Sequence, residues 1–298
     1  MLRATETITS SKNTTTRGIV YMALAMLIFA TQDAVSKHLV GTYSVPQIMW
    51  VRYICFMMIA LVLVSRKGGV RIHLSKRPWL QVLRCIIMVA ETATIVTAFS
   101  MMPMADVHAI FALSPLIVTA LSVVILKEYV GARRWMAVII GFCGMIIILR
   151  PGLTDVSTGA LWTLLGATLF AFYVILTRKV SEADTSETSF MYLAIVGLIV
   201  TSILGPFYWV PPDTEGLGFM ILLACMAAVG HLLLMKALEA APASLLQPLN
   251  YTLLVWATIV GFIVFGDFPD SYTIVGAVII AASGLYTIYR EQIKSRQK

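Results

Sequence analysis

The chain has 298 residues, of which 59% are hydrophobic and only 12% are charged, and its formal net charge is +7. Soluble globular domains carry about 25% charged residues, and a mean hydropathy of +0.88 is too high for a domain whose surface faces water. The composition therefore excludes an ordinary soluble protein and predicts a chain that lies mostly in lipid. The basic residues fall in short loops and tails, so we interpret the positive charge as a topology signal and expect no nucleic-acid partner.

The sequence lacks the motifs that enzymes and metal sites use. The four cysteines lie in apolar runs, without a CxxC spacing or a histidine cluster beside them, so we expect no metal and no cofactor. No HExxH, GxSxG or phosphate-binding Walker motif occurs, so we do not expect an enzyme. A channel is also disfavoured, because rings of like polar groups line a pore, whereas the polar groups here are single and scattered.

Ten apolar segments follow residues 1–17, which we expect to form a cytoplasmic polar tail. They lie near 18–40, 45–65, 79–101, 105–126, 134–149, 159–178, 188–206, 216–238, 243–265 and 272–290. Short loops join them and leave no room for a soluble domain, and a basic tail follows at 291–298. The predicted fold is an all-α membrane protein with ten transmembrane helices.

Lysine and arginine residues are distributed unevenly between the two sides that these segments define. If the N-terminus is cytoplasmic, 18 of the 22 basic residues lie on the cytoplasmic side, and only Lys37 and Arg150 lie at the outer ends. The remaining two, Arg52 and Arg84, lie inside spans. This bias predicts that both termini lie in the cytoplasm. We expect a multi-pass protein of a cell membrane, the inner membrane of a bacterium.

The two halves of the chain share a weak internal repeat. Residues 98–128 align with residues 237–267 at a constant offset of 139, and the order of matched features is kept further along the chain. The repeat divides the chain into a first five-helix unit at 18–150 and a second at 151–290. Because five is odd, the second unit enters the membrane in the opposite sense, as in the inverted repeats of many secondary transporters.

Several motifs resemble a known family. The stretches "SPLIVTALSVVILKE" and "YTLLVWATIVGFIVFGDFPD" each form the end of a fourth helix that opens with Pro and small residues and closes with an acidic residue. With the endings "GFCGMIIILRPG" and "GAVIIAASGLYTIYRE", they make residues 18–290 resemble EamA-type transporters of the drug/metabolite transporter (DMT) superfamily. One element departs from the pattern, since Lys127 precedes Glu128 where Gly–Glu is common.

The resemblance implies ten helices, a small organic solute and alternating access. The family includes metabolite and amino-acid exporters and uptake systems for riboflavin or S-adenosylmethionine, and the last two helices resemble the uptake systems more. We therefore expect a secondary transporter of a ring-bearing metabolite such as riboflavin or S-adenosylmethionine. Export of amino acids, drugs or other metabolites is the alternative. The expected partners are the solute and membrane lipid, and a homodimer is left open.

Ionisable residues inside the spans are the first candidates for the substrate site, because they are costly in hydrocarbon. Asp33 and Arg52 are expected at similar depth, either as a substrate-binding pair or as a structural ion pair. Glu91 lies about 18 Å along its helix, near the membrane midplane, which suits a cation partner, a coupling carboxylate or a neutral interhelical hydrogen bond. Arg84 is about 8 Å from the cytoplasmic end of the same helix, where its stem is long enough to reach the interface as an anchor.

Softer candidates lie in later spans. His231 suits either a proton relay or a packed neutral imidazole. The stretch 244–257 carries amides and aromatic rings around a proline, at Gln247, Asn250, Tyr251 and Trp256. This combination suits a flat, hydrogen-bonding solute, with interhelical packing as the alternative reading. Asp106 and His108 are interpreted as charge and capping residues at the start of the fourth helix.

Small residues recur in the last helix in steps of four, at Gly276 and Gly284 with Ile280 between them, and at the neighbouring Ala277 and Ala281. Such spacing permits a neighbouring helix to approach closely. We expect this helix to provide packing or a dimer surface and to take no part in the chemistry.

Overall fold

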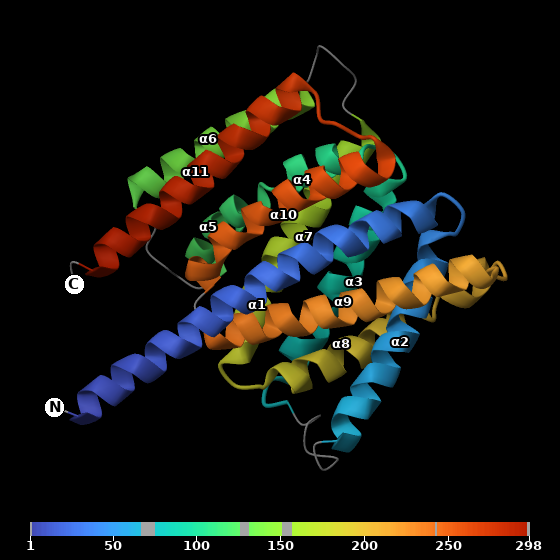
Figure 1. Cartoon of the computed structure of the whole chain (residues 1–298), viewed down its shortest axis with the longest axis horizontal. Helices are drawn as coiled ribbons and strands as arrows, with labels where there is room; N and C mark the ends of the chain where they lie inside the picture. Colours follow the sequence, from blue (N-terminus) through green and yellow to red (C-terminus); the bar gives the residue numbers. More distant parts are fainter. Residues whose placement is uncertain (1, 67–74, 126–130, 151–156, 242, 297–298) are drawn as a thin grey trace.

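The computed structural model describes residues 2–66, 75–125, 131–150, 157–241 and 243–296. These residues form eleven α-helices and one short 3-10 helix, without a strand (Figure 1). The elements are α1 (Leu2–Val40), α2 (Val45–Arg66), α3 (Pro78–Phe99), α4 (Met104–Phe111), α5 (Ser114–Ile125), α6 (Ala132–Leu149), α7 (Thr158–Ser181), α8 (Ser186–Thr201), η2 (Gly205–Tyr208), α9 (Thr214–Ala240), α10 (Ala243–Phe265) and α11 (Ser271–Arg296).

The fourth predicted span is broken in two. It consists of α4 and α5, which are separated by Ala112 and Leu113, and Pro115 lies in the first turn of α5. Proline has no N–H group and disfavours a helical residue before it, so a new helix begins there and the previous one ends. Counting α4 and α5 as one span, the structure has the ten spans that the sequence predicted. By contrast, α10 continues through Pro248.

Length and hydropathy agree with membrane insertion. Within the part of the chain that the structure describes, six segments are long and apolar enough to cross a membrane, and four further apolar helices are shorter. Large apolar side chains such as Ile139, Ile199, Ile263 and Val278 are each at least 60% exposed on the outside of the bundle. A water-soluble protein rarely exposes so many, so these surfaces fit a lipid environment.

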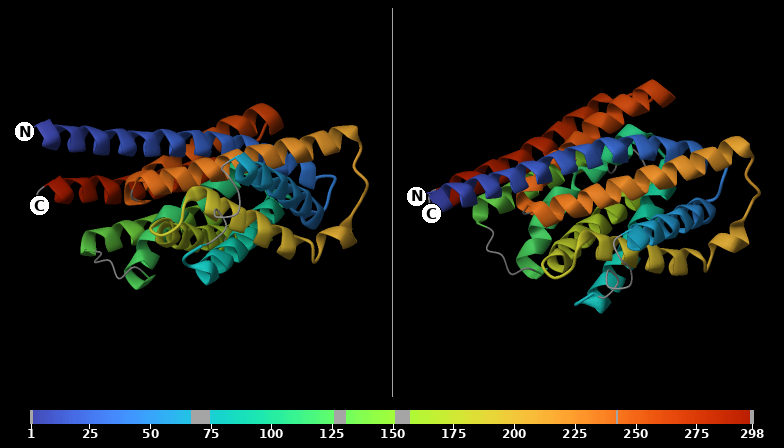
Figure 2. Two further views of the ribbon diagram at one scale, coloured as in Figure 1. Left: turned by 90° about the horizontal axis from the view of Figure 1, so that it is seen from below. Right: turned by 60° about the horizontal axis from the view of Figure 1, so that its bottom comes forward.

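Matching helices of the two halves make equivalent contacts. In the first half α1 packs on α9 and α10, and in the second half the matching first span, α7, packs on α3, α4 and α5. The second spans, α2 and α8, pack on each other, as do the fifth spans, α6 and α11. Figure 1 shows α1 between α9 and α10, and Figures 1 and 2 show that α1 begins at the same end of the molecule at which α11 ends. This is the inverted five-plus-five arrangement.

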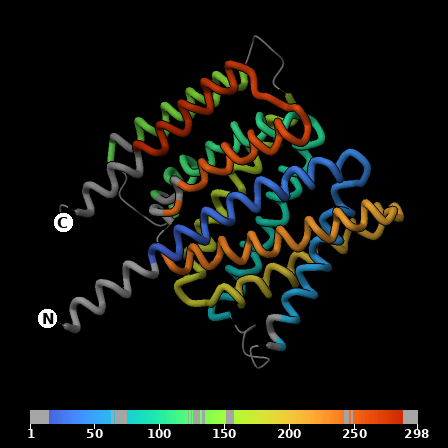
Figure 3. The backbone as a smooth tube through the Cα atoms, in the orientation of Figure 1, coloured from blue at the N-terminus to red at the C-terminus, as the bar shows by residue number. Residues whose placement is uncertain are grey.

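The fifth spans of the two halves touch at their backbones. Figure 3 shows α6 and α11 running side by side along one edge. A Cβ atom on Gly144 would lie 2.8 Å from the carbonyl oxygen of Gly276, and one on Gly276 would lie 2.6 Å from the carbonyl oxygen of Gly144. The small residues of the last helix therefore serve packing within the chain at this point.

Charged residues that were predicted on the outer side gather at one end of the molecule. Lys37 Nζ lies 2.5 Å from Asp267 Oδ2, and Arg150 forms an ion pair with Asp270. Both acidic residues belong to the loop between α10 and α11. The two basic residues that the positive-inside count assigned to the outer ends thus meet the same loop.

Candidate functional site

A cavity lies between the two halves of the chain. It encloses about 800 Å³, its open mouth included, and α1 to α5 line it together with α7, α9 and α10. Its polar lining residues are Gln32, Asp33, Arg52, Glu91, Thr92, His108, Ser114, His231 and Asn250. Aromatic rings of Phe29, Phe111 and Phe170 form part of the remaining wall. Five candidates from the sequence thus meet in one cavity.

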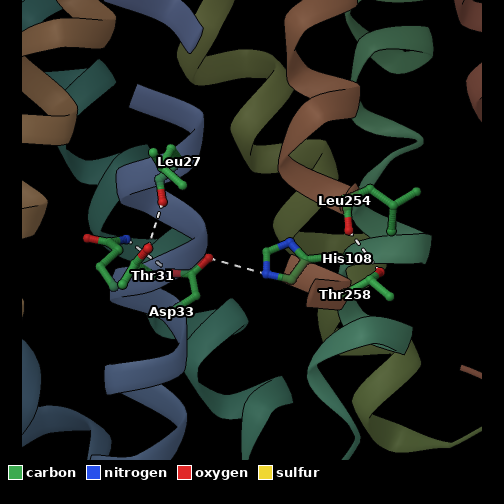
Figure 4. A network of polar contacts seen from close by, with 7 residues as sticks. Leu27, Thr31, Asp33, His108, Leu254 and Thr258 are labelled. Atoms are coloured by element: carbon green, nitrogen blue, oxygen red, sulfur yellow. Dashed lines mark hydrogen bonds and ion pairs between the residues drawn. The ribbon is translucent and has the colours of Figure 1, made fainter. Parts of the chain in front are cut away.

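Asp33 and His108 form one polar group of this cavity. His108 Nε2 lies 3.4 Å from Asp33 Oδ2, and the neighbouring Gln32 donates a hydrogen bond of 3.1 Å to Asp33 Oδ1 (Figure 4). Phe99 and Phe111 flank the imidazole, with ring centroids 5.7 and 6.4 Å away. The sequence suggested a capping role for His108, whereas the structure turns its side chain into the cavity.

Arg52 and His231 form the second polar group. Arg52 Nη2 lies 2.9 Å from His231 Nε2, so α2 of the first half is joined to α9 of the second. The guanidinium lies over the Phe56 ring, at 5.4 Å from its centroid. The expected pairing of Asp33 with Arg52 is not among the described contacts, because each residue has taken a histidine as its partner.

Glu91 lies on α3 with 6% of its surface exposed, and it lines the same cavity. Thr92 Oγ1 donates a hydrogen bond of 3.1 Å to Glu91 Oε2. Asp33 and Arg52, whose ionised side chains have opposite charges, line the same cavity. A carboxyl group in this position has the chemistry to hold a substrate cation or to carry a proton.

Arg84 lies outside this lining although it shares a helix with Glu91. Its side chain is fully buried and donates a hydrogen bond of 2.7 Å to the carbonyl oxygen of Ser189 on α8. The guanidinium also lies 5.4 Å from the centroid of the Tyr173 ring on α7. The sequence suggested an anchor that extends to the membrane interface, whereas the structure buries this arginine between α3, α7 and α8.

The stretch on α10 divides by helical face. Asn250 lines the cavity, whereas Tyr251 packs towards α11, where its hydroxyl occupies the space that a side chain at Gly284 would need. Trp256 is 38% exposed and is not part of the lining. The side chain of Gln247 lies outside the described residues. Only one of the three described candidates on this helix therefore lines the cavity.

The sequence matches a single family in both halves. The model of the EamA-like transporter family matches residues 16–150 and, a second time, residues 157–289. The chain belongs to this family. Each half of this EamA-like transporter is one copy of the family's repeat, which confirms the resemblance to the drug/metabolite transporter superfamily. The protein is a multi-pass membrane transporter of the all-α, inverted-repeat class.

Curated relatives of this EamA-like transporter align with it over almost the whole length of both chains. The chain is 26% identical over 275 residues to an S-adenosylmethionine uptake transporter of Rickettsia prowazekii (strain Madrid E), covering 92% of this chain and 93% of the relative. It is 27% identical over 293 residues to a riboflavin transporter of Vibrio cholerae, covering 97% and 98%. It is 23% identical over 268 residues to the pseudopaline exporter CntI of Pseudomonas aeruginosa, covering 89% and 94%.

One solved crystal structure supports the fold of this EamA-like transporter. It aligns with a TM-score of 0.68 and 11% sequence identity, over 94% of this chain and 99% of the other. At this identity the similarity concerns the arrangement of helices alone.

Proposed function

We propose that this EamA-like transporter takes up S-adenosylmethionine by alternating access of its two halves. The observation that carries the proposal is a cavity whose wall carries carboxyl groups and a guanidinium next to aromatic rings. Asp33 and Glu91 supply carboxylates, and Arg52 supplies a guanidinium. S-adenosylmethionine carries a sulfonium and an ammonium group, a carboxylate and an adenine ring, so each kind of wall group has a complementary group on the solute.

Riboflavin is the second candidate. The relative from Vibrio cholerae bears that name, and Asn250 with the phenylalanine rings would suit a flat ring system with amide edges. Riboflavin has no charged group, however, and would leave the guanidinium of Arg52 without an anionic partner. Buried charged groups without partners weaken binding, so we favour the zwitterionic solute.

The driving force is inferred from what the chain carries. It has no nucleotide-binding motif, so a solute or ion gradient must drive transport. We infer that Glu91 or Asp33 couples protons to transport, and that the protein catalyses no covalent reaction. The positive-inside bias supports both termini in the cytoplasm, and the bacterial origin of the relatives supports a bacterial inner membrane. The matched ranges support repeat units near 18–150 and 151–290.

Transport in proteoliposomes tests the proposal. Purified protein is reconstituted into proteoliposomes that are loaded with unlabelled solute. Counterflow of labelled S-adenosylmethionine and of labelled riboflavin is then measured in parallel. We expect saturable counterflow of S-adenosylmethionine, and a rate that changes when a pH difference is imposed. Counterflow of riboflavin alone would overturn the substrate assignment, and a non-saturable flux would indicate a channel.

A Glu91→Gln variant tests the site. Losing a charged hydrogen-bonding partner costs about 1.5–3 kcal/mol, which corresponds to a roughly 10–100-fold loss of affinity. We expect transport to fall by that order while thermal stability is retained. Glu215→Gln is the matched control, because Glu215 lies exposed in the first turn of α9. Near-normal transport by Glu91→Gln would remove Glu91 from the site.

A further inference from the structure

The guanidinium of Arg52 is a buried cation that lacks an anion. Arg52 is 2% exposed, and within the part of the chain that the structure describes no carboxylate lies at ion-pair distance from it. Its hydrogen-bonding partner there is the neutral acceptor His231, and its Nε has no partner. A guanidinium is always charged and has five N–H donors, so most of its capacity is left over. Burying a charge without a counter-ion is costly.

The two nearby carboxylates do not fill this role. Asp33 is engaged by His108 and Gln32, and Glu91 accepts a hydrogen bond from Thr92. Both nevertheless line the cavity that Arg52 lines. The cavity therefore contains an acidic region and a separate guanidinium with free donors, which is the division that a zwitterion requires.

His231 fixes the direction of the guanidinium. Because Arg52 can only donate, His231 Nε2 must accept, so the imidazole is neutral with its proton on Nδ1. The ring is held by aromatic neighbours, with centroids 5.2 Å from Phe29, 6.0 Å from Phe56 and 6.4 Å from Tyr173. An imidazole that is packed on several sides has one orientation, and it holds one edge of the guanidinium in place.

We propose that Arg52 binds the carboxylate of the transported amino-acid moiety, and that His231 is the positioning residue that orients Arg52 for it. The proposal rests on the proposed function and adds the part of the cavity in which the solute's carboxylate binds. A planar carboxylate matches the fork of a guanidinium with two parallel hydrogen bonds. Since Arg52 belongs to the first half and His231 to the second, the bound carboxylate also attaches to a contact that crosses between the halves.

Two solutes that differ in one group give the test. Saturation kinetics in proteoliposomes are measured for S-adenosylmethionine and for its decarboxylated analogue, which keeps the adenine, the sulfonium and the amine. In Arg52→Gln we expect KM for S-adenosylmethionine to rise roughly 10–100-fold, the value of a lost charged hydrogen-bonding pair. KM for the decarboxylated analogue is expected to change by less than roughly threefold, because that solute never made the contact.

Conservative variants keep the test decisive if Arg52→Gln does not fold. Arg52→Lys retains the charge but loses the fork, so it is expected to give an intermediate KM for S-adenosylmethionine alone. His231→Leu removes the acceptor and is expected to raise the same KM, whereas His231→Gln keeps an acceptor and is expected to restore part of the loss. A purely structural histidine would change both solutes alike and would not distinguish Gln from Leu.

The outcomes separate this inference from the proposed function. If wild-type protein transports S-adenosylmethionine but the Arg52 variants alter both solutes equally, the carboxylate assignment is overturned and the function stands. If the decarboxylated analogue is the better substrate of the wild-type protein, the assignment is also overturned. If neither solute is transported by wild-type protein, the proposed function fails, and this inference fails with it.

Discussion

Asp33 Oδ2 and His108 Nε2 lie 3.4 Å apart, and they join the first span to the half of the fourth span that precedes its break. The break follows His108 by four residues, at Ala112 and Leu113. A helix that ends inside the membrane must satisfy its last carbonyl groups within the protein. The contact between Asp33 and His108 links a side chain of α1 to one of α4 close to the least regular part of the bundle.

A double-mutant cycle on this pair tests whether the contact contributes to the stability of the fold. We expect Asp33→Asn and His108→Gln each to lower the unfolding temperature, and their combination to lower it by less than the sum. Residues in direct contact show interaction energies of roughly 0.5–3 kcal/mol. The measurement is thermal unfolding of the purified protein in detergent. A cycle that pairs His108→Gln with Glu215→Gln should be additive, and additivity of the Asp33 cycle as well would mean that the contact contributes no stability.

Substitution by lysine is predicted to affect stability at Arg84 and solute binding at Arg52. Arg84 donates to the Ser189 carbonyl and stacks on Tyr173, away from the cavity, so Arg84→Lys should destabilise the protein. Losing a hydrogen bond from a charged donor costs about 1.5–3 kcal/mol. Surviving protein should bind solute with unchanged KM. In Arg52→Lys we expect a raised KM and a smaller shift of the unfolding temperature. A large KM effect in Arg84→Lys would place Arg84 in the site.

The sequence predicts which residues line the cavity better than it predicts which of them contact one another. Glu91, Arg52, His231 and Asn250 could be found because charged and amide side chains are rare in apolar spans, where each needs a reason to be present. Which residue contacts which depends on helix rotation and on how the fourth span breaks. The break brings His108 to Asp33, and this frees Arg52 from the partner that depth alone had suggested.

Adjacent residues on one helix can also face different parts of the protein. Asn250 and Tyr251 are adjacent in the chain, yet one faces the cavity and the other faces α11. Successive residues of a helix point about 100° apart, and a uniformly apolar helix such as α10 gives no pattern that fixes which direction faces inward. The aromatic wall of Phe29, Phe111 and Phe170 was missed for the same reason, since phenylalanine is common on every face of a membrane helix.

The crossing of α6 and α11 is predicted to be intolerant of any side chain. A Cβ atom at Gly276 would lie 2.6 Å from the backbone oxygen of Gly144, so the two helices must separate in Gly276→Ala. Overpacking of this kind costs about 1–3 kcal/mol. In the control Gly218→Ala no heavy atom lies within 4 Å of the new Cβ, and a gain of up to about 1 kcal/mol is expected from helix propensity. Equal unfolding temperatures for the two variants would mean that the helices are not in close contact.

The loop between α7 and α8 supplies a prediction about pH. Burial would raise the pKa of Asp184, but hydrogen bonds from Ser75, the Lys76 N–H and Gln81 outweigh it, and the pKa lies below the usual value. A carboxyl group with a lowered pKa stabilises the fold above its unfolded pKa, about 3.9 for aspartate, and loses that contribution as the pH falls through the lower folded value.

Asp184→Asn is therefore expected to destabilise the protein at pH 7, by about 2 kcal/mol if one charged hydrogen bond is lost. The difference from wild type should shrink as the pH falls below about 4, because the carboxyl group of the unfolded wild-type chain then binds a proton before that of the folded protein does. Thermal unfolding in detergent over a pH series measures both effects. Glu182→Gln is the control in the same loop: Glu182 is 57% exposed and lies 3.7 Å from Arg77, and a surface pair of this kind contributes at most about 1 kcal/mol. A difference for Asp184→Asn that stays constant from pH 7 to pH 3 would show that the carboxylate charge is not what holds the loop.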